Sequence, residues 1–181
     1  MKIALFLCVI VAVLFFLITA YSKRQPKGTP GLNDDGMMLL DAEELGEGHI
    51  GSSYENDVIP LLTKYISHPT EIDENFDSET GSYKVSSQNK TYVIYSPEMD
   101  LSEGHPWGNA TFALFDIVNR QLQDSPYRFY AINGGNDLCG IFLTYEARTQ
   151  AIESLEQKTD WPYLPEDNPP WYGQPHDESP N

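Results

Sequence analysis

The chain has 181 residues and a formal net charge of −16, which fits one domain with extensions at its ends. All 27 acidic residues lie after position 28 with only seven of the 11 basic residues, so residues 28–181 carry a net charge of −20. This charge argues against nucleic acid as a partner, because phosphate binding needs a basic face, and against attachment of the domain to anionic lipid. Hydrophobic residues make up 40% of the chain, enough for a real core.

Residues 3–20 form an uncharged run whose apolar character is interrupted only by Thr19. A run of this length can span a bilayer, whereas the apolar core of a secretory signal is usually shorter. We therefore expect an uncleaved transmembrane helix within residues 1–22. The alternative is a signal segment that is cleaved near Ala20–Ser22, which would export the domain to the periplasm or the exterior.

The basic residues at the two ends of this run predict the topology. Lys2 and the terminal amine precede the run, and Lys23, Arg24 and Lys27 follow it. By the positive-inside rule, the more basic flank, and the soluble domain with it, faces the cytoplasm.

Residues 23–55 have the composition of a flexible acidic tether. They are rich in glycine and acidic residues and contain two prolines, and the only apolar island is at 37–40. Such a segment buries too little apolar surface to fold by itself. The island could dock on the domain or on a partner.

The folded domain is predicted to cover residues 56–160. Its first helix begins after Asp57 as the N-cap, which places Pro60 in the first turn, where its missing N–H is no loss. The helix ends at His68-Pro69. Helical spacing relates its apolar side chains, which are Val58, Leu61, Leu62, Tyr65 and Ile66.

An acidic segment follows at 70–81. Its oxygen-bearing side chains from Asp73 to Glu79 are spaced like the start of a calcium-binding loop. Ser78, however, occupies the position that requires glycine, and Lys84 occupies the position of the bidentate glutamate. We therefore expect a solvated acidic loop without a metal ion.

Two hairpins separated by a helix make up the rest of the domain. Strands at 82–86 and 91–96 flank a turn, and a helix then runs from its N-cap Asn109 to residue 123. Strands at 127–132 and 138–144 flank a turn rich in glycine and asparagine. Thr144 caps a third helix that reaches residue 157.

The predicted order of elements is therefore α-β-β-α-β-β-α. Strand pairs between helices indicate an α+β domain with an antiparallel sheet of two hairpins and helices packed on it. The helix between the hairpins would allow all four strands to join one sheet.

Residues 161–181 form a tail with six prolines and four aromatic residues. Proline prevents regular structure, but this aromatic content predicts that residues 161–171 wrap over the domain. Residues 169–172 also match the Pro-Pro-x-Tyr pattern of ligands for WW domains, which is an alternative use of the tail.

Neither a catalytic motif nor a metal or cofactor motif is present. Cys139 lies in an apolar run that indicates a buried strand, so we expect it to be a core residue. No two of the four histidines have the spacing of metal ligands. We therefore predict no metal ion and no cofactor.

Together these features predict a membrane-anchored acidic α+β interaction domain, non-enzymatic, that binds a basic protein partner. One version is an immunity-type protein that masks a cationic toxin. The alternatives are a hydrolase or metal-dependent enzyme with a dispersed site, and an exported ligand-binding domain. The candidate partner-binding residues are His105, Trp107, Trp161, Trp171 and Tyr172.

Overall fold

The computed structural model describes residues 32, 36–99 and 104–167 of the protein. The predicted membrane segment at 3–20 and the end of the tail at 168–181 lie outside these residues. Within the described part, no helix combines the length and the apolar character needed to cross a membrane.

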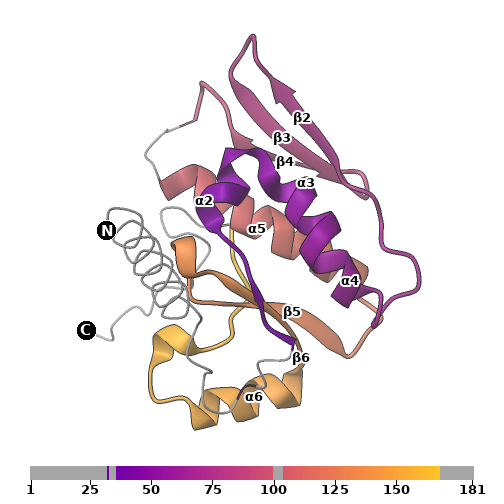
Figure 1. Cartoon of the computed structure of the whole chain (residues 1–181), viewed down its shortest axis with the longest axis vertical. Coiled ribbons are helices and arrows are strands. Elements are labelled where there is room, and N and C mark those ends of the chain that lie inside the picture. The colour runs from indigo at the N-terminus through magenta and orange to yellow at the C-terminus, as the bar shows by residue number, and fades with distance from the viewer. Residues whose placement is uncertain (1–31, 33–35, 100–103, 168–181) are drawn as a thin grey trace, which may run out of the picture.

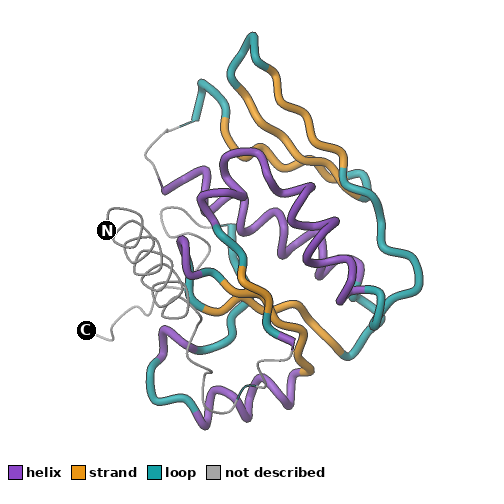
Figure 2. Tube along the Cα trace, viewed as in Figure 1, coloured by secondary structure: helices purple, strands orange, loops and turns teal. Residues whose placement is uncertain are grey.

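The described residues form a single α+β domain with two separate antiparallel sheets. The first sheet has the order β2-β3-β4, from β2 (Asp73–Asp77), β3 (Ser82–Ser87) and β4 (Lys90–Tyr95). The second has the order β1-β6-β5, from β1 (Met38–Leu39), β6 (Cys139–Thr144) and β5 (Tyr127–Ile132). The predicted hairpins are present, but each lies in its own sheet instead of joining a single sheet (Figure 2).

Helix α5 (Gly104–Gln121) connects the two sheets and contacts both β4 and β5 (Figure 1). Its buried stripe includes Leu114, Phe115 and Val118. The helix begins earlier than the predicted N-cap, Asn109, which instead lies inside the helix and donates from Nδ2 to the Ile94 carbonyl at 2.9 Å. The predicted start at Asn109 is therefore wrong.

A kinked helical segment runs from residue 42 to residue 62 beside α5. It consists of α2 (Ala42–Glu44), α3 (Ile50–Ser53) and α4 (Ile59–Leu62), joined by two wider turns of five residues each. The kink is at Gly48, whose φ of 111° is unfavourable for residues with a side chain. Five side chains along one face are fully buried, namely Leu45, Ile50, Tyr54, Val58 and Leu62.

This helical segment corrects the predicted tether over residues 41–55. Asp41, not Asp57, is the N-cap, and its Oδ1 accepts from the backbone N–H of Glu43 at 2.9 Å. The glycines that resemble a linker serve close packing, because a Cβ on Gly46 would lie 3.0 Å from Trp107 Cδ1. Composition therefore masked a helix whose buried side chains recur every four or five residues.

Strand β2 corrects the predicted loop at 70–81. The strand pairs with β3 from Asp73↔Ser86 to Asp77↔Ser82. Apart from Phe76 its residues are polar and most of its side chains are exposed, so it carries no apolar alternation by which a strand could be recognised. Pairing with the buried strand β3, not local sequence, decides its conformation.

The two predicted hairpin turns and the predicted cap at Thr144 are present. Gln88 and Asn89 have φ values of 49° and 62° in the two-residue turn between β3 and β4. Thr144 caps α6 (Tyr145–Ser154), accepting from the N–H of Ala147 at 3.2 Å. In the described part of the tail, Tyr163 exchanges backbone hydrogen bonds with Ala131 of β5, so this part covers the domain as expected.

A stack of aromatic rings forms the centre of the core between α4, the second sheet and α5. Phe129 stacks on Phe115 with ring centroids 4.4 Å apart and contacts Phe142 at 4.6 Å; Phe142 stacks on Tyr65 at 4.7 Å. Gly140 of β6 leaves the space for the Phe129 ring, since a Cβ there would lie 2.6 Å from Cε2. The ring stack therefore depends on a residue without a side chain.

Replacing this glycine tests the packing. Gly140→Ala is expected to lower the free energy of unfolding by about 1–3 kcal/mol, because the added methyl group overlaps the Phe129 ring in a closely packed core. Chemical denaturation monitored by circular dichroism measures the change. Gly36→Ala is the matched control, since an added Cβ there meets nothing within 4 Å. Equal stability of the two variants would contradict the described packing.

Candidate functional site

The distribution of charge is the most unusual feature of the described residues. They include 21 acidic and seven basic residues, a net charge of −14. Several of the cations are engaged within the fold. Lys90 pairs with Asp116 at 2.7 Å, the Arg128 guanidinium donates to the carbonyls of Leu122 and Ser125, and Arg148 donates to the Pro162 carbonyl. Most carboxylates are therefore left to face solvent.

Four exposed carboxylates lie along the kinked helical segment, and two of them, Glu44 and Asp57, line one depression. Glu44, Glu47, Glu55 and Asp57 are all exposed, and we call this surface the acidic helix face. The opposite side of the same segment is the buried stripe that packs into the core. Within the described part of the chain, no hydrogen bond or ion pair engages these four carboxylates. They are thus available to a ligand without loss of an internal contact.

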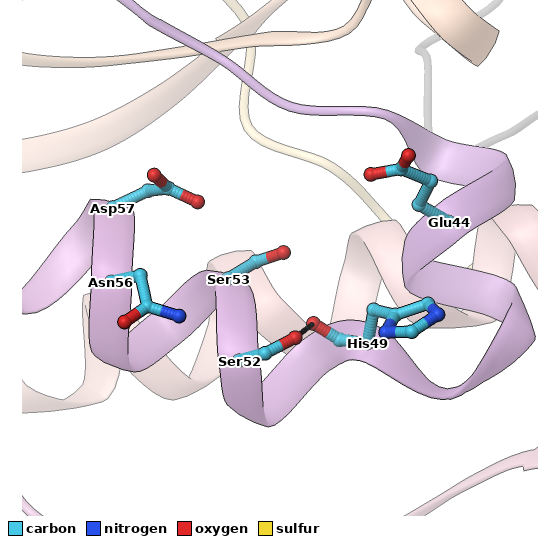
Figure 3. A pocket seen from close by; sticks show the side chains of 6 residues that line it. All are labelled: Glu44, His49, Ser52, Ser53, Asn56 and Asp57. Atoms are coloured by element: carbon cyan, nitrogen blue, oxygen red, sulfur yellow. Dashed lines mark hydrogen bonds between the residues drawn. The ribbon is translucent and has the colours of Figure 1, made fainter.

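A polar depression lies within the acidic helix face (Figure 3). It has a volume of about 250 Å³, and all its lining side chains are polar: Glu44, His49, Ser52, Ser53, Asn56 and Asp57. Figure 3 shows Glu44 and His49 at one end, Asn56 and Asp57 at the other, and the two serines between them. The depression is therefore an acidic, open surface, not an apolar ligand pocket.

The residue types in the depression include a histidine, two serines and two acids, but they are not connected as a catalytic unit. The Ser52 hydroxyl donates to the backbone carbonyl of His49 at 3.0 Å, not to its imidazole (Figure 3). A nucleophilic serine requires a hydrogen bond from its hydroxyl to a base. No group of three histidine, cysteine, aspartate or glutamate side chains within the described ranges could hold a metal ion. The arrangement favours recognition of cationic or hydrogen-bonding groups.

Glu74 of β2 fixes the position of the acidic helix face against the first sheet. Because the helix restarts after Gly48, the backbone N–H groups at the start of α3 lack partners within the helix. Glu74 Oε1 accepts from the N–H of Gly51 at 2.9 Å and also from the Tyr83 hydroxyl. A Cβ on Gly51 would lie 2.7 Å from the Glu74 carboxyl carbon, so this contact requires glycine. The carboxylate also places negative charge at a helix N-terminus.

Tyr83 completes this contact from β3. Its side chain is 1% exposed, and its hydroxyl donates to Glu74. Burial, followed by the hydrogen bond to Glu74 and the charge of Glu74, raises the pKa of the Tyr83 hydroxyl well above its ordinary value. The hydroxyl therefore remains protonated and a donor throughout the physiological range.

The predicted partner-binding residues do not form one surface. His105 and Trp107 lie in the first turn of α5, where Trp107 packs against Gly46. Trp161 follows α6 and donates from Nε1 to the Leu155 carbonyl at 3.2 Å. Figure 1 shows the start of α5 and the segment after α6 well apart. Trp171 and Tyr172 lie outside the described residues.

The residues of the acidic helix face were missed because most of them fall in the predicted tether. Helical spacing of Leu45, Ile50, Tyr54 and Val58 was the signal that could have placed them. With that spacing recognised, the acidic residues between them fall on the opposite, solvent-facing side of the helix. No family model, curated protein or solved structure matches the chain.

Cys139 is the cysteine in the described part of the chain, and it lies in the second sheet. It is 2% exposed and packs with Tyr130, Ile132 and Ile141 on the sheet face away from α5. Burial, with a smaller contribution from the charge of Asp137, raises the pKa of the thiol to about 11. The thiol is therefore protonated at neutral pH and unsuited to act as a nucleophile.

This environment predicts slow modification of Cys139 in the folded protein. At pH 8 we expect iodoacetamide to modify Cys139 at least about tenfold more slowly in the native chain than in urea, since only the thiolate reacts. Mass spectrometry of the peptide that contains Cys139 measures this rate. Between the ordinary thiol pKa and about 11, the thiol ionises in the unfolded chain but not in the folded protein. The free energy of unfolding is therefore unaffected at neutral pH and falls as the pH rises through this window. Equal native and denatured rates would contradict the burial.

Proposed function

We propose that the protein is a membrane-anchored, non-enzymatic interaction domain that binds a basic protein partner through the acidic helix face. In this proposal residues 3–20 span the membrane and the domain lies on the cytoplasmic side. The observation that carries it is the set of four exposed carboxylates that have no partner among the described residues, on a segment whose other side is fixed in the core. A rigid charged surface loses little conformational entropy when it binds.

The strength of such binding depends on how the charges are arranged. A net charge of −14 on the described residues attracts a cationic protein over distances of about one Debye length, roughly 8 Å at physiological salt. At 1 M salt this length falls to about 3 Å, so long-range attraction is lost. The acidic helix face would then orient the partner after encounter, since complementary charges fix register.

Charge-neutralised variants test the proposal. Glu47→Gln, Glu55→Gln and Asp57→Asn together remove three charges from the acidic helix face without touching the core. The full chain in detergent micelles is used to capture proteins from its native membranes at about 0.1 M salt. We expect wild type to retain a protein of high isoelectric point that the triple variant recovers at least about fivefold less, and that about 1 M salt releases.

The matched control removes the same charge elsewhere. Glu146→Gln, Glu153→Gln and Glu156→Gln lie at exposed positions in or just after α6, and this control variant should retain the partner as wild type does. Equal loss in both variants would mean that net charge alone, not the acidic helix face, recruits the protein. Retention by the first variant, or retention at high salt, would contradict the proposal.

A further inference from the structure

The outer edge of β2 is a sheet edge without a hydrogen-bonded neighbour among the described residues. The edge of β4 is approached by the Asn109 amide, which donates to the Ile94 carbonyl, and the edge of β5 is covered by Tyr163. β1 has only two residues. No hydrogen bond from another described segment reaches the outer edge of β2, and Figure 1 shows no described element beyond it. Proteins usually cover such edges, because unpaired backbone groups attract another strand.

The side chains of β2 give this edge a distinct chemical character. Asp73, Asn75 and Asp77 share the outer face of the sheet with Lys84, since Asn75 pairs with Lys84. Glu74 and Phe76 share the inner face with Val85 and Tyr83. Glu71 and Glu79 flank the strand, so acidic residues outnumber the one lysine. A basic segment is therefore the complementary occupant.

Phe76 supplies an apolar contact at this edge. It lies on the same face as the buried Tyr83, yet it is 63% exposed. The Tyr83 ring in turn lies 5.8 Å from that of Tyr95 on β4, so three aromatic side chains cross the sheet and the outermost one is uncovered. A side chain on an added strand, opposite Phe76, would extend this row.

We propose that the outer edge of β2 binds an extended basic segment of a protein partner as a fourth strand of the sheet. Backbone hydrogen bonds to β2 supply the pairing. Successive side chains of a strand point to opposite faces, so basic residues of the added strand would alternate with apolar ones. The basic residues would lie on the face of Asp73 and Asp77, and an apolar residue would pack on Phe76 on the other face. This inference rests on the proposed function and specifies a second contact of the same partner.

The acidic helix face lies close to the edge of β2, which supports a single partner that contacts both surfaces. Glu74 of β2 binds the N–H of Gly51 in α3, so the edge strand and the acidic helix face belong to adjacent elements. A second copy of this chain would bring the same acidic edge opposite itself, and like charges facing each other across strands are destabilising. Charge therefore favours a basic partner over self-pairing.

Two peptides test the proposal on the full chain in detergent micelles. The first is a capped nine-residue peptide of alternating lysine and valine with a fluorescent label. The second has the same sequence with N-methyl groups on two adjacent central residues, which keeps the charge but prevents continuous strand pairing. We expect the first peptide to bind at low salt and to slow amide hydrogen exchange in residues 73–77, and the second to bind at least about tenfold more weakly.

Variants on the two edges of the sheet locate the contact. Phe76→Thr should weaken binding of the first peptide about two- to fivefold, whereas Val93→Thr, a matched control at an exposed position on β4, should leave it unchanged. Equal binding of both peptides, or no effect of Phe76→Thr, would overturn strand addition and leave charge-driven binding standing. Failure of the first peptide to bind better than a serine–valine peptide would overturn the proposal that the occupant is basic. If the capture experiment also failed, the proposed function would fail with it.

Discussion

The contact of Glu74 with the N-terminus of α3 joins the kinked helical segment to the first sheet. Gly48 breaks the helical segment and creates a second helix start in its middle, with backbone N–H groups that need partners. Glu74 reaches across from β2 to accept from Gly51, and Tyr83 donates to the same carboxylate. A charge-assisted hydrogen bond contributes about 1.5–3 kcal/mol, and less where solvent reaches it. It adds to the burial of the apolar stripe of the kinked segment and to the pairing of β2 with β3.

This contact also brings the candidate binding features together. The acidic helix face lies on the segment that Glu74 holds, and the open edge belongs to the strand that carries Glu74. Glu74 thus has a structural role, while the four carboxylates of the acidic helix face accept no hydrogen bond from the described residues. The division explains how so acidic a chain folds: its apolar stripe and aromatic stack supply the core, and repulsion is kept at the surface.

Local sequence predicted those elements that local chemistry determines. The turns at 88–89 and 133–137 and the cap at Thr144 depend on a few residues with strong conformational preferences, and they are present as expected. Strand β2 was not predicted, because it depends on pairing with β3. The helical residues 41–55 were missed because their glycines and acidic residues masked the helical spacing of their apolar side chains. β2 has no apolar alternation, and Gly46 and Gly51 serve contacts with Trp107 and Glu74 that no local pattern reveals. The division into two sheets likewise depends on how α5 packs.

The candidate site was even less predictable than the fold. Aromatic residues drew attention to Trp107 and Trp161, but both contribute to packing or backbone contacts within the domain. The exposed carboxylates that form a surface became recognisable only once helical residues 42–62 separated a buried side from an exposed side. In an acidic chain, the number of acidic residues does not locate a binding surface, whereas their exposure along one rigid element does.

The most direct measurement is amide hydrogen exchange at Gly51, by nuclear magnetic resonance, in the wild-type chain and in Glu74→Ala, which has no side-chain acceptor. If Glu74 caps α3, the Gly51 amide is protected in wild type and exchanges at least about tenfold faster in the variant, while the amide of Ala147, capped by Thr144, is unchanged. Rapid exchange of Gly51 in wild type, or equal protection in both chains, would contradict the central role of Glu74.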